Sequence, residues 1–130
     1  MFKTNIINSL IHTFLEVLLN FYALFFKKIA KGVEGRKKSF DKIKTSFSKN
    51  DKIIHIHCSS YGEYLMSEEL TANLKKNFTE YKFLLSFISP SGYENANKSL
   101  FDCVIYLPLA SNKNLKKFYG LISPKITLFI

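Results

Sequence analysis

The stretch KIIHIHCSSYGE, residues 52–63, decides the fold of this chain. Residues 52–60 form a nearly continuous apolar run that ends in two serines, which is typical of a strand covered on both faces. From Gly62 to Phe78 the apolar residues recur with helical spacing, at positions 65, 66, 70, 74 and 78. The sequence therefore predicts a strand that turns tightly into a helix, the repeating unit of a parallel sheet.

The same alternation continues to the end of the chain. Strands are predicted over 81–89, 103–109 and 125–130, and helices over 91–101 and 111–123. The order β-α-β-α-β-α-β favours a parallel sheet with right-handed crossovers, so the predicted fold class is α/β and Rossmann-like. A chain of 130 residues holds one such domain, and we expect it over residues 53–130.

Three loops follow the predicted strands, at residues 59–63, 89–92 and 107–111. Because ligands bind beyond the carboxyl ends of parallel strands, these loops are expected to face one cleft. Neither a GxGxxG motif nor a Walker lysine motif is present, which disfavours dinucleotides and nucleoside triphosphates. Two Gly-containing turns open helices whose N-termini could attract a phosphate or a sugar carboxylate.

Glu63 stands in the first turn of the first predicted helix, and two interpretations of it remain open. A carboxylate at that position stabilises the helix electrostatically, which is a structural role. The same carboxylate could instead be a general base at the floor of the cleft. Gly62 beside it permits a tight backbone turn.

The cysteines and histidines predict no metal site and no bound cofactor. Cys58 and Cys103 lie in apolar runs without CxxC spacing, as expected of buried, reduced thiols. His55 and His57 share one face of a strand, but metal ligation needs more ligands at suitable spacing than the sequence offers. We expect these histidines to be structural.

Residues 1–30 are predicted to form a membrane-associated apolar helix. Four polar residues recur every four positions within it and would stack as one narrow stripe: Asn8, His12, Glu16 and Asn20. A carboxylate in mid-segment is costly against lipid, so a helix lying in the membrane interface, with its polar stripe facing outward, is favoured. A true membrane span and an ordinary core helix are the alternatives.

Residues 31–52 are predicted to be a basic connector with one short helix, because Gly32 and Gly35 interrupt the pattern. Residues 27–52 contain ten Lys and Arg side chains against three acidic ones, a net charge of +7. This strip suits an anionic membrane surface better than nucleic acid, because few aromatic residues are interleaved with the cations. The residues expected at the membrane surface are Lys27, Lys28, Lys31, Arg36, Lys37 and Lys38.

Three motifs resemble the N-terminal half of the 3-deoxy-D-manno-octulosonic acid (Kdo) transferases: HCSSYGE at 57–63, FISPSGYE at 87–94 and YLPL at 106–109. The resemblance implies a two-lobed GT-B glycosyltransferase that transfers Kdo from CMP-Kdo to lipid A precursor at the cytoplasmic face of the bacterial inner membrane. It implies that Glu63 is the general base on the acceptor hydroxyl. It also implies a set of turn-shaping or substrate-binding residues: His57, Ser59, Ser60, Gly62, Ser89, Ser91 and Gly92.

The chain departs from this family pattern at three positions, with His55 in place of Trp, Tyr61 in place of Val and Ala110 in place of Asp. The donor-binding C-terminal lobe that the resemblance implies is not in the sequence, so CMP-Kdo binding is expected only together with such a lobe. We therefore expect an N-terminal fragment with little activity alone. A membrane-associated lipid-binding module without catalysis is the alternative.

Overall fold

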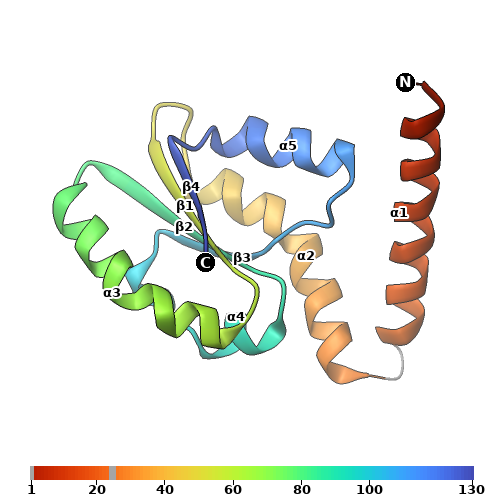
Figure 1. Cartoon of the computed structure of the whole chain (residues 1–130), viewed down its shortest axis with the longest axis horizontal. Coiled ribbons are helices and arrows are strands. Elements are labelled where there is room, and N and C mark those ends of the chain that lie inside the picture. The colour runs from red at the N-terminus through yellow and green to blue at the C-terminus, as the bar shows by residue number, and fades with distance from the viewer. Residues whose placement is uncertain (1, 24–25) are drawn as a thin grey trace.

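The computed structural model describes residues 2–23 and 26–130, and its centre is one parallel sheet (Figure 1). The sheet has the order β3-β2-β1-β4, and every neighbouring pair is parallel. Its strands are β1 (Lys52–Cys58), β2 (Tyr81–Phe87), β3 (Cys103–Tyr106) and β4 (Ile126–Phe129). The predicted α/β, Rossmann-like fold class is confirmed.

Helices cover both faces of the sheet (Figure 1). One face carries α3 (Tyr61–Asn77), the short α4 (Pro90–Asn95) and a 3₁₀ turn at Lys98–Leu100. The other face carries α2 (Lys27–Ser46) and α5 (Asn112–Ile122). Because side chains alternate along a strand, β1 sends Ile54 and Ile56 to the α3 face and Ile53 to the α2 face.

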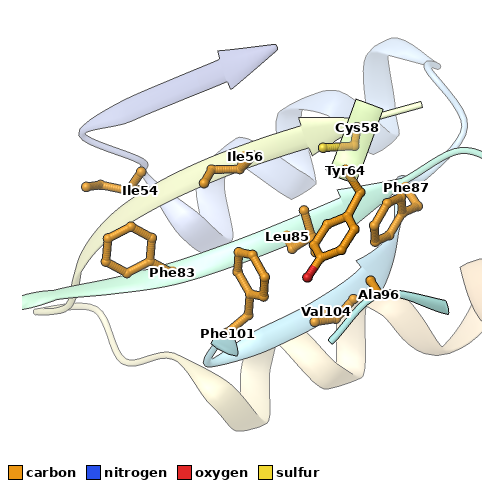
Figure 2. Close-up of a cluster of buried hydrophobic side chains, with 10 residues drawn as sticks. All are labelled: Ile54, Ile56, Cys58, Tyr64, Phe83, Leu85, Phe87, Ala96, Phe101 and Val104. Atoms are coloured by element: carbon orange, nitrogen blue, oxygen red, sulfur yellow. The ribbon is translucent and has the colours of Figure 1, made fainter. Parts of the chain in front are cut away.

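The core on the α3 face forms around Tyr64, which points from the helix toward the sheet among Phe83, Phe87 and Phe101 (Figure 2). The Tyr64 ring lies 6.1 Å from that of Phe87, and its hydroxyl accepts a hydrogen bond of 3.3 Å from the backbone N–H of Asn97. Burial raises the pKa of Tyr64 to about 12. Tyr64 therefore fixes how α3 lies on the sheet.

Helix α3 occurs where predicted, but only part of its apolar pattern faces the core, where Leu74 and Phe78 pack. Its buried residues are Tyr64, Ser67 and Thr71, while Met66 is 71% exposed. Leu65 and Leu70 are exposed as well. Tyr64 occupies the space above the strands, which turns these aliphatic side chains outward.

Helix α2 corrects the predicted connector: residues 27–46 form one continuous helix of 20 residues that packs on β3. Gly35 lies against the ring of Tyr106, where a Cβ atom would overlap the ring. Ser39 donates a hydrogen bond of 2.7 Å to the carbonyl of Tyr106, and Ile43 enters the core. Gly35, one of the two glycines that suggested a helix break, thus lets helix and strand approach closely.

Several element ends also differ from the prediction. Strands β1 and β2 end two residues earlier than predicted, and β3 ends at Tyr106, two residues before Pro108, which has no N–H for a ladder. The helix predicted over 91–101 is divided into α4 and the 3₁₀ turn.

Helix α1 (Phe2–Ala23) stands beside α2 at one side of the lobe (Figure 1). Its polar stripe faces two cavities against the lobe, lined by residues that include His12, Glu16 and Asn20. Its large apolar side chains lie on the outside, with Phe14 65% and Leu10 64% exposed. Helix α1 therefore does not bury its apolar side as an ordinary core helix would. None of the helices in the described residues is long and apolar enough to cross a membrane.

Candidate functional site

The three loops at the carboxyl ends of β1, β2 and β3 lie at one edge of the sheet, as predicted, and main-chain hydrogen bonds tie them together. The N–H of Ser89 donates to the carbonyl of Ser59 at 3.0 Å. The N–H of Leu107 donates to the carbonyl of Phe87 at 2.7 Å. The three loops, at residues 59–63, 89–92 and 107–111, are therefore connected by hydrogen bonds, and we call them the platform.

Glu63 sits on this platform in the first turn of α3. Ser60 is the N-cap residue, and its hydroxyl accepts a hydrogen bond of 3.4 Å from the N–H of Glu63. In return, one carboxylate oxygen of Glu63 accepts a short hydrogen bond from the N–H of Ser59. Within the described residues the second oxygen has no hydrogen-bond partner, and the side chain is half-buried. The S-x-x-E spacing of residues 60–63 was a sequence signal for this reciprocal cap.

The two glycines of the predicted site have different surroundings. Gly92 is buried against Phe87, and a Cβ atom there would overlap the ring, so packing accounts for the glycine. A Cβ atom on Gly62 would meet only the Ser60 hydroxyl oxygen, at 3.9 Å. Gly62 is exposed, so packing does not account for this glycine.

Ser89 and Ser91 open α4 beneath the same edge. The Ser89 hydroxyl accepts a hydrogen bond of 3.1 Å from the N–H of Ser91, and the two hydroxyl oxygens are 2.7 Å apart. Ser91 is exposed and Ser89 half-buried. Both serines are engaged in capping, and their substrate-binding role stays a prediction.

The His57 side chain lies on the face of β1 that is covered by α5, opposite to the face covered by α3. Its Nδ1 lies 2.8 Å from the hydroxyl oxygen of Ser86, which is also 2.8 Å from Nε2 of His55. Burial lowers the pKa of His57, and the negative charge of nearby Glu63 opposes that shift. Burial lowers the pKa of His55 to about 3. Both histidines are therefore neutral at physiological pH.

A cavity of about 220 Å³ lies between α1, α2 and the loop after β3, away from Glu63. Arg36 lines it and also donates a hydrogen bond of 2.9 Å to the carbonyl of Ile88, directly before the Ser89 loop. Burial lowers the pKa of Arg36. Arg36 thus belongs to the lobe and supports the end of β2, a role that the charge pattern alone did not indicate.

The other cations of the predicted membrane surface whose side chains the structure describes are exposed or paired. Lys31 forms an ion pair of 3.8 Å with Glu94, and Lys38 pairs with Glu34 one turn away. Lys27 and Lys37 are exposed, and the side chain of Lys28 lies outside the described residues. Their contact with a membrane stays a prediction.

Comparison with known proteins bears on the platform as a whole. Residues 33–130 match the family described as 3-deoxy-D-manno-octulosonic-acid transferase (kdotransferase). The chain belongs to this kdotransferase family. The match begins within α2 and covers all four strands, so it includes Glu63 and the three loops.

Similarity to a glycosyltransferase of known sequence supports the same class. The chain is 30% identical over 119 residues to a bifunctional glycosyltransferase/methyltransferase of Fusobacterium nucleatum subsp. nucleatum. The aligned region is 88% of this chain but 18% of the relative, so the chain spans a small part of that protein. No solved structure matches the chain. The kdotransferase lobe is thus similar to a glycosyltransferase. Its three loops carry the Glu63 carboxylate.

The described part of this kdotransferase lobe contains no cluster of side chains suited to bind a metal ion. No group of three or more His, Cys, Asp or Glu side chains is placed to hold an ion there. Both cysteines are free and buried, as expected from the sequence, and burial raises the pKa of each thiol.

Proposed function

We propose that this chain is the acceptor-binding lobe of a glycosyltransferase that transfers Kdo from CMP-Kdo to lipid A precursor in lipopolysaccharide biosynthesis. One observation carries the proposal: the Glu63 carboxylate is held by the Ser59 N–H at the carboxyl edge of a sheet whose sequence matches the kdotransferase family. The glycosyltransferase relative supports the reaction class.

In this proposal Glu63 is the general base. One oxygen is fixed by the Ser59 N–H, which leaves the other to meet an acceptor hydroxyl at the carboxyl edge of the sheet. There it would remove the proton of the acceptor hydroxyl as the sugar leaves its phosphate. The bare backbone at Gly62 lets the acceptor approach within contact distance. CMP-Kdo would be held by a second lobe that closes over the platform.

We also propose that the lobe works at the cytoplasmic face of the bacterial inner membrane. The outer side of α1 is apolar, and the basic strip follows directly. An apolar helix side together with a polybasic segment is a two-part membrane signal. Flotation with vesicles of anionic and of neutral lipids tests this: binding should favour anionic vesicles and weaken in Phe14→Asp. Equal recovery with both vesicle types would contradict it.

The transfer reaction is tested with Glu63→Gln and Glu63→Ala, each assayed with CMP-Kdo and lipid A precursor after a kdotransferase C-terminal lobe is supplied. Both variants should lose transfer by a factor of roughly 100 or more, as expected when a general base is removed. Glu63→Gln keeps an oxygen that accepts from the Ser59 N–H, so it isolates the chemistry from the cap. Unchanged transfer in Glu63→Gln would refute the base assignment.

A second candidate function is a lipid-binding module without catalysis. It is favoured by the capping role of Glu63, which accounts for one of its two carboxylate oxygens. This alternative predicts that lipid A precursor binds wild type and Glu63→Gln equally and that neither transfers Kdo. Transfer by the wild type alone would exclude it.

A further inference from the structure

Three buried polar side chains form a chain of hydrogen bonds between β1 and β2, on the face covered by α5. Ser86 is fully buried, and its hydroxyl oxygen is 2.8 Å from both His55 Nε2 and His57 Nδ1. His55 is 1% and His57 6% exposed. Ser86 lies directly opposite His57 in the strand register.

The hydrogen bonds among His55, Ser86 and His57 can be arranged in only two ways, because the number of available protons is fixed. A serine hydroxyl has one proton, so it donates to one ring, and the other ring must donate to it. In the first arrangement His55 Nε2–H donates to Ser86, and Ser86 donates to His57 Nδ1. In the second arrangement every donor is reversed, and the proton of His55 moves to its Nδ1.

The surroundings favour the first arrangement. Among the described residues His55 Nδ1 is buried without a partner, so a proton there would be a buried donor with no acceptor, which costs free energy. The first arrangement also places the His57 proton on Nε2, across the ring from Ser86. The negative charge of Glu63 opposes the lowering of the His57 pKa, so the carboxylate and the ring lie in the same part of the site.

We propose that His55 and Ser86 are positioning residues that hold His57 as the Nε2–H tautomer, which makes it a hydrogen-bond donor to a substrate oxygen beside Glu63. His57 Nε2 has no hydrogen bond within the described residues, and unlike His55 Nδ1 it is not sealed from solvent. The site then pairs one donor with one acceptor, which orients a sugar hydroxyl because such a group both donates and accepts. The substrate part of this inference rests on the proposed function.

The tautomer is measured by ¹⁵N NMR of the histidine rings in the 130-residue chain, without any substrate. The wild type should show an unprotonated Nδ1 and a protonated Nε2 for both His55 and His57. The Nε2 proton of His55 should exchange slowly with water, because it is buried and bonded to Ser86. A protonated Nδ1 on either ring would overturn the inference without any variant being needed.

Ser86→Ala and Ile53→Val separate this role from simple packing. Loss of the hydroxyl should shift the His57 Nδ1 resonance toward that of a free lone pair and should abolish the slow exchange of the His55 proton. Ile53 is equally buried on the same side of β1, so Ile53→Val should change neither signal. Unchanged ring signals in a folded Ser86→Ala would also overturn the inference. Failure of Kdo transfer in the wild type would refute the proposed function and leave the tautomer result standing.

Discussion

Acid pH should destabilise the lobe through His55. The folded chain holds the pKa of His55 at about 3, against 6.5 for an unperturbed histidine, because burial disfavours the charged ring. Phe118 packs edge-on against the ring at 5.3 Å, and the like charge of His57 acts in the same direction. Below about pH 6.5 the unfolded chain therefore binds a proton that the folded chain does not.

The direction and the size of the pH effect on the unfolding free energy follow from this difference in proton binding. The unfolded state gains protons as the pH falls, so stability falls with pH from about 6.5 down to about 3, where the folded ring also protonates. Between pH 7 and pH 5 His55 alone should remove about 2 kcal/mol of unfolding free energy, at 1.4 kcal/mol per unit of separation. His57 shifts in the same direction and adds to the loss. The pKa values of Asp51 and Glu34 are lowered, so those carboxyl groups titrate below this window.

The assay is urea unfolding followed by circular dichroism at pH 7, 6 and 5, for wild type and His55→Gln. Glutamine keeps an amide N–H for Ser86 but does not titrate, so His55→Gln should lose about 2 kcal/mol less than wild type between the two ends of the range. Ile53→Val is the control, since it should cost roughly 1 kcal/mol at every pH. Equal losses in wild type and His55→Gln would refute the claim that His55 is neutral in the folded chain.

Two further pairs of variants test packing and capping. Gly35→Ala should lower the unfolding free energy by about 1–3 kcal/mol, because its methyl group would overlap the Tyr106 ring. In Gly62→Ala the added methyl group makes only an ordinary contact with the Ser60 hydroxyl oxygen. This change should raise the unfolding free energy by up to about 1 kcal/mol through helix propensity, as chemical denaturation of the two proteins would show. Glu63→Ala should cost about 1 kcal/mol by removing the acceptor for the Ser59 N–H, whereas Glu63→Gln should stay within about 0.5 kcal/mol of wild type. A stability loss in Glu63→Gln as large as that in Glu63→Ala would show that charge, and not the hydrogen bond, supports the helix.

The order of strands and helices from residue 52 onward was determined by local patterns in the sequence. Parallel strands buried on both faces are apolar along their whole length, and small polar turns separate them from helices, so each element has a local signature. The position of Glu63 at the strand-to-helix turn followed from the same signature. Its capping partner could also be predicted from the sequence, because Ser60 stands three residues before Glu63.

The tertiary structure decided the features that depend on contacts between distant residues. Gly35 suggests a helix break until Tyr106, about 70 residues later, is placed against it, and Ser39 donates a hydrogen bond to the carbonyl of that same residue. A buried hydrogen-bonded chain through His55 and Ser86 joins two strands whose pairing no local pattern specifies. Sequence by itself determined where elements and the Glu63 turn lie. Only the folded chain decided which glycines are needed for packing and which protons the histidines hold, because both depend on atoms brought together across the sheet.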